Sequence, residues 1–408
     1  MNKKKIINDP VYGFITIPGD LVFDIIEHRY FQRLRYIKQL GLTDFVYPAA
    51  LHTRFQHALG AMHLMGKVLD NLRHKNVEIS DREYESAQLA VLLHDIGHGP
   101  FSHALEDTLL PGIHHESLSY LFMEKLNREF DGALDLCLKI FRNSYERKFF
   151  HQLVSSQLDI DRLDYLKRDC FFTGVEEGNI GVERITAMLN VHRDELVVEE
   201  KGILNIENFL NARRFMYWQV YLHKTSVGAE RMLVNLIRRA QALVRAEEQL
   251  PATAPLMTFL KKEFTLAAFK EDDSLLDAYG QLDDHDLWGG IKLWRDHPDR
   301  ILSLLSQMIL ERKLFQITLS AEPISKEIVE KIRDAITREY GTLRVETPYL
   351  FSHGIVTNEA YAVGKQINIL MRSGELLDIA QASDLPNIQA ISKIVKKNYL
   401  CWPKNVSL

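Results

Sequence analysis

Apolar residues recur at helical spacing from Gly19 to about Val244, and this long pattern is the feature that most constrains the fold. Only short groups of Gly, Pro and Asn interrupt it, for example at Gly41, Pro48 and 97–100. Apolar side chains that return every three or four residues form one stripe on each helix, and this stripe must be buried against neighbouring helices. The sequence therefore predicts a mainly α fold for this part of the chain.

Short segments with the alternation of β-strands accompany the helices. Residues 11–18 (VYGFITIP) are β-rich, and residues 195–206 (ELVVEEKGILNI) predict two strands around Lys201-Gly202, which would form a small β-hairpin. Beyond Pro251 and Pro255 the pattern changes. Further strands are expected at 313–320, 342–351 and 366–372, and a helix at 324–340.

At 408 residues the chain exceeds the usual limit for one hydrophobic core, so more than one unit is expected. We predict a helical domain over residues 1–250, a helical connector over 251–310 and a smaller C-terminal α+β region over 311–408.

Composition limits the partners of the chain. The formal net charge of -5 argues against a general nucleic-acid-binding surface, although local basic pockets remain open. Cys137, Cys170 and Cys401 are far apart, as in a reduced cytoplasmic protein. The basic start MNKKKII is followed by no adequate apolar segment, and no run approaches about 18 apolar residues. We therefore expect a soluble, cytoplasmic protein with no membrane partner.

The run AVLLHDIGHGPFSH places His94 and Asp95 at the end of a leucine-rich helix. Burying this pair is costly unless both groups are hydrogen-bonded, as a satisfied core histidine and a capping aspartate would be, or bound to a cation. His57 in HTRFQH and Asp161 in DIDRLDYLKRD complete a set of two imidazoles and two carboxylates. Such a set suits a hard-to-borderline divalent cation. The chemistry to expect is metal-assisted hydrolysis.

Cationic and phenolic groups accompany these candidates. Arg54 lies three positions before His57, so on a helix one side chain could bind metal while the other holds an anion. A second helical face carries Asp161, Arg162, Tyr165 and Asp169. Taken alone, that face could equally be a solvated one with ordinary ion pairs. In combination, the segments indicate hydrolysis of a phosphate ester.

Six motifs identify a family. In chain order they are INDPVYG, FQRLRYIKQLG, HTRFQHALG, HDIGHGPFSH, HHES and DIDRLDYLKRD. Their order and separations over about residues 5–225 resemble the deoxynucleoside triphosphate triphosphohydrolase branch of the HD-domain phosphohydrolases. The resemblance implies the HD-domain helical fold and four metal ligands, His57, His94, Asp95 and Asp161. The ligand set does not choose among Mn, Fe, Ni, Zn and Mg.

The resemblance also implies catalytic side chains, and these are His98, His103, Glu106 and His115. Glu106 stands where the family has an aspartate, so its carboxylate is one methylene further from the backbone. Of the adjacent His114 and His115, we prefer His115 because Glu116 follows it as in the family. His103 would lie near the leaving oxygen.

Substrate and activator contacts are implied in the same way. The substrate-binding candidates are Gln39, Leu40, Arg54, Arg162, Tyr165, Asp169, Arg213 and Tyr221. Phe215 and Trp218, between the last two, are interpreted as an aromatic core stripe. Lys5, Asn8, Glu27, Gln32 and Arg35 resemble positions at which relatives bind an activating guanine nucleotide, GTP or dGTP, although they could equally be solvated surface residues. A shared site of this kind requires an oligomer, expected to be a homodimer or homotetramer.

The expected reaction is attack at the α-phosphorus of a dNTP, which releases deoxynucleoside and tripolyphosphate. The residues alone support hydrolysis of a phosphate ester, and the bond cleaved comes from the resemblance. Two alternatives stay open. One is an HD phosphohydrolase that acts on another nucleotide, such as a monophosphate or a cyclic species. The other is a catalytically silent nucleotide-sensing or nucleic-acid-binding protein, against which the retained His98 and His115 argue.

Overall fold

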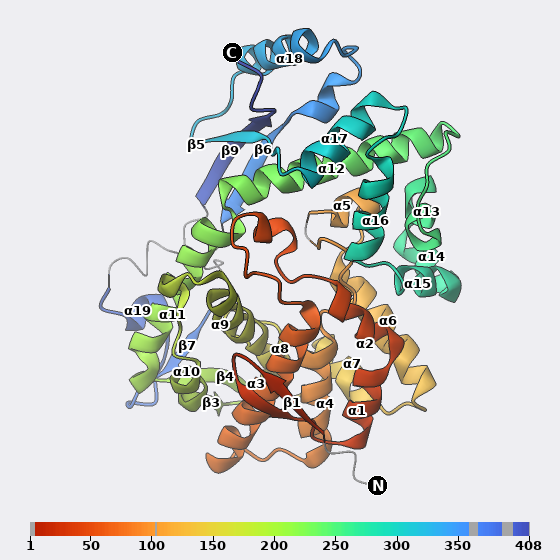
Figure 1. Cartoon of the computed structure of the whole chain (residues 1–408). Coiled ribbons are helices and arrows are strands. Elements are labelled where there is room, and N and C mark those ends of the chain that lie inside the picture. The colour runs from red at the N-terminus through yellow and green to blue at the C-terminus, as the bar shows by residue number, and fades with distance from the viewer. Residues whose placement is uncertain (1–4, 103, 359–365, 386–394, 408) are drawn as a thin grey trace.

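The computed structural model describes residues 5–102, 104–358, 366–385 and 395–407. Helices dominate the fold (Figure 1), which confirms the mainly α prediction. The first helices are α1 (Asp20–Glu27), α2 (Arg29–Gln32), α3 (Arg54–His74), α4 (Asp81–Leu93), α5 (Glu106–Leu109), α6 (His115–Glu129), α7 (Asp135–Phe141), α8 (Lys148–Val154), α9 (Ile160–Thr173), α10 (Val182–Met188), α11 (Ile203–Met216) and α12 (Lys224–Arg245). The later helices are α13 (Ala254–Lys261), α14 (Leu266–Glu271), α15 (Asp273–Tyr279), α16 (Asp284–Trp294), α17 (Arg300–Leu310), α18 (Lys326–Tyr340) and α19 (Ile379–Ala382).

Three helices position the site, and local capping fixes where each begins or ends. Helix α3 starts after Thr53, whose backbone N–H donates to the Gln56 side chain at 2.8 Å. Helix α4 ends at Leu93, with His94 as its C-cap. Helix α9 starts after Asp159, whose carboxylate accepts the Arg162 N–H at 2.8 Å. Capping therefore places the predicted metal ligands in the first turn of α3, at the end of α4 and in the first turn of α9.

Three small sheets complete the fold. The first is the antiparallel hairpin of β1 (Ile6–Asp9) and β2 (Gly13–Thr16), which confirms the β character of 11–18. The second has the order β3-β4-β7-β8 and contains β3 (Leu189–His192), β4 (Glu195–Glu199), β7 (Asn368–Leu370) and β8 (Leu376–Asp378). The third has the order β5-β9-β6 and contains β5 (Gln316–Ser320), β9 (Val395–Trp402) and β6 (Ser352–Asn358).

The internal β-hairpin exists, but its predicted position at 195–206 was wrong. Its turn lies at Arg193-Asp194, where both residues have positive φ, rather than at Lys201-Gly202. Residue Gly202 has φ −88° and precedes α11, which begins at Ile203. A tight two-residue turn needs the left-handed conformation that the earlier pair adopts. The strand pattern of residues 203–206 therefore belongs to a helix.

The C-terminal region is only partly as predicted. Strand β5 and helix α18 confirm the expectations for 313–320 and 324–340. The strand predicted over 342–351 was wrong, because Thr347–Leu350 form a 3₁₀ turn with Pro348 near its start. Residues 366–372 do contain a strand, β7, but it pairs in parallel with β4. The C-terminal region thus also extends the sheet at the internal hairpin.

Buried apolar side chains from Ile15 to Val406 form one continuous core, and the proposed boundaries at 250 and 310 stay a prediction. The three cysteines are free of disulfide bonds. Within the described residues, we find no helix whose length and hydropathy would let it cross a membrane.

Candidate metal and active site

Four predicted ligands meet where α3, α4 and α9 converge. The Nε2 atoms of His57 and His94 lie 3.1 and 3.3 Å from the Asp161 Oδ1 atom. Asp95 offers two oxygens, with Oδ1 3.2 Å from the Nε2 of His94 and Oδ2 3.8 Å from that of His57. Ligand atoms at about 2.1 Å from an ion, at right angles to one another, are about 3 Å apart. The spacing therefore suits a shared divalent ion.

The hydrogen bonds of the two imidazoles test whether an ion fits. His57 Nδ1 bonds the Asp164 carboxylate at 2.7 Å, and His94 Nδ1 bonds the Val91 carbonyl at 2.6 Å. Both partners accept, so each Nδ1 carries the proton. The two Nε2 atoms are buried and have no hydrogen-bond partner among the described residues. Once each Nε2 has given up its proton to make room for an ion, imidazoles fixed in this way present their Nε2 lone pairs to one point, as metal-ligating histidines do.

The electrostatics at this point favour positive charge. Burial lowers the pKa of His57, but Asp161 and Asp164 raise it, to about 10. Burial also lowers the pKa of His94, yet Asp95 and Asp161 raise it, to about 9. Without an ion the carboxylates hold protons on both rings. A divalent cation would compensate the negative charge of the same carboxylates.

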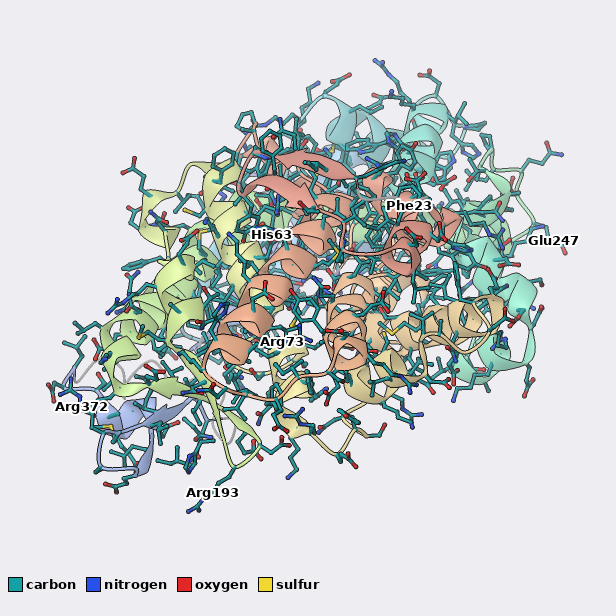
Figure 2. All side chains as sticks on the ribbon, turned by 90° about the horizontal axis from the view of Figure 1, so that it is seen from below. Phe23, His63, Arg73, Arg193, Glu247 and Arg372 are labelled. Atoms are coloured by element: carbon teal, nitrogen blue, oxygen red, sulfur yellow. The ribbon has the colours of Figure 1, made fainter. Side chains whose placement is uncertain are left out.

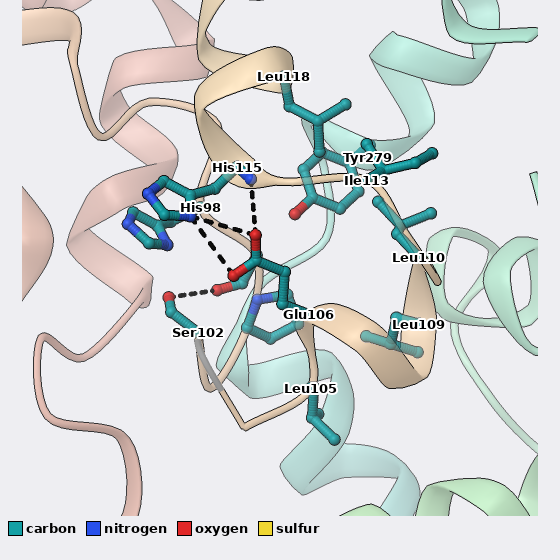
Figure 3. A pocket seen from close by; sticks show the side chains of 12 residues that line it. His98, Ser102, Leu105, Glu106, Leu109, Leu110, Ile113, His115, Leu118 and Tyr279 are labelled. Atoms are coloured by element: carbon teal, nitrogen blue, oxygen red, sulfur yellow. Dashed lines mark hydrogen bonds and ion pairs between the residues drawn. The ribbon is translucent and has the colours of Figure 1, made fainter. Parts of the chain in front are cut away.

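A second histidine group, His98 and His115 (Figure 3), lies beside the first, because His98 Nε2 is 3.2 Å from Asp95 Oδ1. The rings of His98 and His115 stack with centroids 3.7 Å apart. Glu106 accepts the His115 backbone N–H at 2.7 Å and lies 3.2 Å from its Nδ1. The longer side chain at Glu106 therefore still reaches the histidine. Apolar residues surround this carboxylate, namely Leu105, Leu109, Leu110, Ile113 and Leu118.

The turn after α4 brings His98 to His115 because Gly97 allows close approach. A Cβ on Gly97 would lie 2.3 Å from the His115 carbonyl oxygen. The Gly97 N–H donates to Ser119 Oγ at 2.9 Å, and that hydroxyl donates to the His94 carbonyl at 2.6 Å. The metal-ligand turn is thus docked directly on the first turns of α6.

The positive charge of Arg54 lies between the two histidine groups and affects the protonation of His98. Its guanidinium donates to Asp95 at 2.5 Å and to Ser102 Oγ at 3.0 Å. Burial and the Arg54 charge hold the pKa of His98 well below its usual value, despite the nearby Asp95. His98 is therefore neutral near pH 7, unlike His57 and His94 in the ion-free protein.

Asp95 and Asp161 of the first group and both histidines of the second line a cleft of about 470 Å³, a size typical of small-molecule sites. Predicted site residues on its wall are Gln39, Leu40, Arg54, Asp95, His98, His115, Asp161, Tyr165, Asp169 and Tyr221. Neither Arg162 nor Arg213 belongs to this lining. Arg162 pairs with Asp159, and Arg213 is buried and donates to Gln157 at 3.0 Å. His103 lies outside the described residues.

The predicted aromatic core stripe was wrong. Phe215 is 46 % exposed, because α11 turns it away from the core. Trp218 is half-buried and lies under the Lys397 amine at 4.0 Å from the ring centroid. Here α11 passes into a π-helical turn over Tyr217–Tyr221, which shifts the helical register. The shift could not be read from the spacing of the aromatic residues.

Several site residues escaped the sequence reasoning. Asp164 orients His57, although its spacing of three from Asp161 was a usable signal. Asp169 accepts hydrogen bonds from Tyr221 at 2.8 Å and bonds His52 at 2.7 Å, and His52 carried no local signal. Other cleft residues not predicted are Tyr217, Glu230 and Arg231. Burial raises the pKa of Glu230 to about 7, although Arg231 lowers it.

A later helix braces the active-site turn. Asp284, the first residue of α16, accepts the Phe101 N–H at 2.8 Å and the Lys38 N–H at 2.9 Å. Phe101 follows the His98 turn, and Lys38 precedes the cleft residue Gln39. One buried carboxylate therefore ties together two walls of the cleft.

The five predicted regulatory residues lie at the N-terminal end of the fold. Lys5 precedes β1 and places its amine 4.1 Å from the Phe23 ring centroid. Arg35 donates to Gln32 at 2.7 Å. Asn8 and Glu27 are exposed. Their regulatory role stays a prediction.

Comparison with known proteins is consistent with this geometry. The HD domain family matches residues 54–169, and the HD associated region matches residues 180–287. An uncharacterized protein of Bacillus subtilis, YwfO, is 33% identical over 323 residues, which cover 78% of this chain and 72% of YwfO. A Dictyostelium discoideum protein named as a deoxynucleoside triphosphate triphosphohydrolase SAMHD1 homolog is 32% identical over 60% of this chain and 51% of its own length. The chain thus spans about half of that relative.

A solved structure extends the likeness to the whole chain. The crystal structure of a phosphohydrolase from Bacteroides thetaiotaomicron is 48% identical, with a TM-score of 0.95 over 98% of this chain and 100% of that one. A hypothetical protein of Aquifex aeolicus has a TM-score of 0.70 at 27% identity, over 98% of this chain and 97% of its own. The metal-ligand motif, the convergent helices and these relatives agree: the chain belongs to the HD-domain family of metal-dependent phosphohydrolases.

Proposed function

We propose that this protein hydrolyses deoxynucleoside triphosphates to deoxynucleoside and tripolyphosphate, with one divalent metal ion. The observation that carries the proposal is one cleft of about 470 Å³, because it joins metal-ligand candidates, two histidines and an aromatic wall. Relatives named as dNTP triphosphohydrolases, 32% and 29% identical, support this substrate class.

The ion would be held by His57, His94, Asp95 and Asp161. A divalent cation there supplies positive charge that polarises a phosphate ester and makes water a better nucleophile at neutral pH. These four ligands do not distinguish Mn, Fe, Ni, Zn and Mg.

Arginines would bind the triphosphate. Arg54 is the best placed, because it lies in the cleft between the two histidine groups. Its fixed fork of donors suits phosphate oxygens. Arg162 and Arg213 lie outside the cleft lining, where they contact Asp159 and Gln157, so they would have to turn toward the cleft.

The second histidine group would handle the proton. His115 would protonate the departing ester oxygen, while Glu106 keeps its imidazole oriented and His98 supports the ring by stacking. The predicted place of His103 near the same oxygen belongs to this proposal.

The nucleoside would bind against the remaining wall. Gln39 and Leu40 would contact sugar and base from one side, and Tyr165 and Tyr221 from the other. Asp169 would hold Tyr221 in place through their hydrogen bond of 2.8 Å.

A guanine nucleotide, GTP or dGTP, would activate the enzyme at Lys5, Asn8, Glu27, Gln32 and Arg35. A homodimer or homotetramer would assemble that site from more than one subunit. Four of these side chains are exposed, as an intersubunit site requires before assembly.

The test is chromatographic product analysis with Mn²⁺ and each of the four dNTPs, with and without GTP. Deoxynucleoside and intact tripolyphosphate are expected, and an Asp161→Asn preparation should produce neither. Release of pyrophosphate or orthophosphate from dNTPs would contradict the proposed bond cleavage. Equal rates with and without GTP would contradict activation only.

A further inference from the structure

The metal-ligand candidate His57 ends a buried chain of charged groups that starts at the N-terminal hairpin. Its Nδ1 donates to Asp164 Oδ2 at 2.7 Å. The Arg168 guanidinium grips the same carboxylate with two bonds, from Nε at 2.9 Å and from Nη2 at 3.0 Å. Arg168 Nη1 then donates to Asp9 Oδ2 at 2.8 Å. Asp9 is the last residue of β1.

Burial makes these contacts consequential. His57, Asp164 and Arg168 have no exposed surface, and Asp9 is 5 % exposed. Removing one partner from a buried ion pair leaves an uncompensated charge, which is strongly destabilising. Two carboxylates and one guanidinium leave one net negative charge behind the imidazole. A cation at the Nε2 of His57 would balance that charge.

Helix α3 has a notch for this network at Gly60. A Cβ at this position would lie 2.1 Å from both Arg168 Nη2 and Asp164 Oδ1. No side chain fits there unless the ion pair moves. Because Gly60 follows His57 by three residues on α3, one helix supplies both the ligand and the seat for the groups that orient it.

Asp9 has a second task in the hairpin itself. Its Oδ1 accepts the N–H groups of Val11 at 3.0 Å and Tyr12 at 2.9 Å, which closes the turn between β1 and β2. The hairpin lies over α3 near His63 (Figure 2), and the Tyr12 ring is 5.5 Å from the His63 ring. The orientation of Arg168 and the docking of the hairpin are therefore linked through one carboxylate.

We propose that Arg168 and Asp9 are positioning residues of the metal centre, so that docking of the N-terminal hairpin and binding of a divalent ion stabilise each other. Asp164 fixes the His57 ring, Arg168 fixes Asp164, and Asp9 fixes Arg168. Outer partners of metal-ligating histidines change metal affinity about 10–100-fold. Linkage is reciprocal. If the bound ion favours docking of the hairpin by a given factor, loss of docking lowers the affinity for the ion by the same factor. The inference rests on the proposed metal site.

Asp9→Asn is the sharpest variant. It keeps the Oδ1 acceptor that closes the hairpin turn and replaces the oxygen facing Arg168 with an amide donor. Glu183→Gln is the matched control. It removes the ion pair between Glu183 and Lys167, with N···O 2.7 Å, and Lys167 lies next to Arg168 on α9. Mn²⁺ affinity is measured by calorimetry on the full chain, at a temperature where circular dichroism shows both variants folded.

We expect Mn²⁺ to bind Asp9→Asn about 10-fold more weakly than wild type, with Glu183→Gln unchanged. Wild-type affinity in Asp9→Asn would overturn the inference, and dNTP hydrolysis by wild type would still support the proposed function. A wild-type chain that binds Mn²⁺ without hydrolysing dNTPs would end the proposed function and leave this comparison valid.

Hydrogen exchange on the wild-type chain provides a test that needs no variant. Mn²⁺ should slow exchange of the amides at 6–16, because the ion stabilises the docked hairpin. Identical exchange with and without a saturating ion would overturn the inference, even if Asp9→Asn failed to fold.

Discussion

Two histidine groups lie side by side at one cleft, yet the surroundings of His98 favour the opposite charge state from those of His57 and His94. Carboxylates around His57 and His94 raise their pKa values to about 10 and about 9 against the effect of burial. Burial and the Arg54 guanidinium instead hold the pKa of His98 well below its usual value. The difference teaches that the charges around each imidazole ring, and not the residue type, determine whether that histidine carries a proton near pH 7. The first group suits a cation, whereas in the second group His98 is kept neutral.

The largest expected effect is a difference in metal content between variants of the first and second histidine groups. His94→Ala should lose the ion and at least about 10³-fold in dNTP turnover, since an ion supplies several kcal/mol of transition-state stabilisation. His98→Ala should keep the ion, because its ring is not one of the four ligands. Elemental analysis and turnover of the purified variants measure both. Loss of the ion from both variants would mean that the groups form one metal site, and the comparison would break.

The proton-transfer role of the second group is tested on two adjacent residues. His115→Ala should lower kcat about 10²-fold or more, the usual value of a general acid, while Mn²⁺ content stays at the wild-type level. His114→Ala is the control, because its side chain is 73% exposed and its Nδ1 lies 3.7 Å from Glu106, beyond hydrogen-bond distance. Steady-state kinetics with dGTP compare the two. Equal kcat in both variants would refute the assignment of His115.

The pH dependence of metal binding tests the first group. The ion-free His57 and His94 keep a proton up to about pH 9, and Mn²⁺ must displace it. Mn²⁺ affinity should therefore rise between pH 7 and 9, about 10-fold per pH unit for each proton released. These pKa values exceed the unfolded value of about 6.5, so the ion-free chain should also lose stability as the pH rises from about 6.5 to 9–10. Calorimetry in two buffers counts the protons, and a constant Kd from pH 7 to 9 would contradict the raised pKa values.

The smallest effect concerns the brace at Asp284. Asp284→Asn replaces one of two buried acceptors with a donor, so the free energy of unfolding should fall by about 1–3 kcal/mol. Mn²⁺ affinity should stay unchanged, because the brace holds the turn after His98 rather than the ligands on α3 and α9. Chemical denaturation and calorimetry measure the two quantities, and the exposed Asp296 gives the control, Asp296→Asn. A large loss of Mn²⁺ affinity would show that the two groups are not independently supported.

Sequence alone predicted the parts of the site that depend on local structure. The motifs that carry His57 and Asp161 lie on helices, as their local spacing indicated, and the structure puts both residues in first turns, after Thr53 and Asp159. The leucine-rich helix ends at His94 as expected. The four ligand candidates meet because three helix ends meet.

Features that depend on long-range packing could not be predicted in this way. Arg168 pairs with Asp9 across 159 residues, and Asp284 binds Phe101 across 183. The parallel pairing of β4 with β7 is equally remote. The exposure of Phe215 follows from how α11 packs. In each case the partner, not the local pattern, determines the outcome.

The most direct test of the central claim is a crystal structure with Mn²⁺, with the ion located by its anomalous signal. The account predicts one peak, about 2.0–2.3 Å from the Nε2 atoms of His57 and His94 and from carboxylate oxygens of Asp95 and Asp161. A peak held instead by Asp95, His98 and His115, without His57 or Asp161, would contradict it.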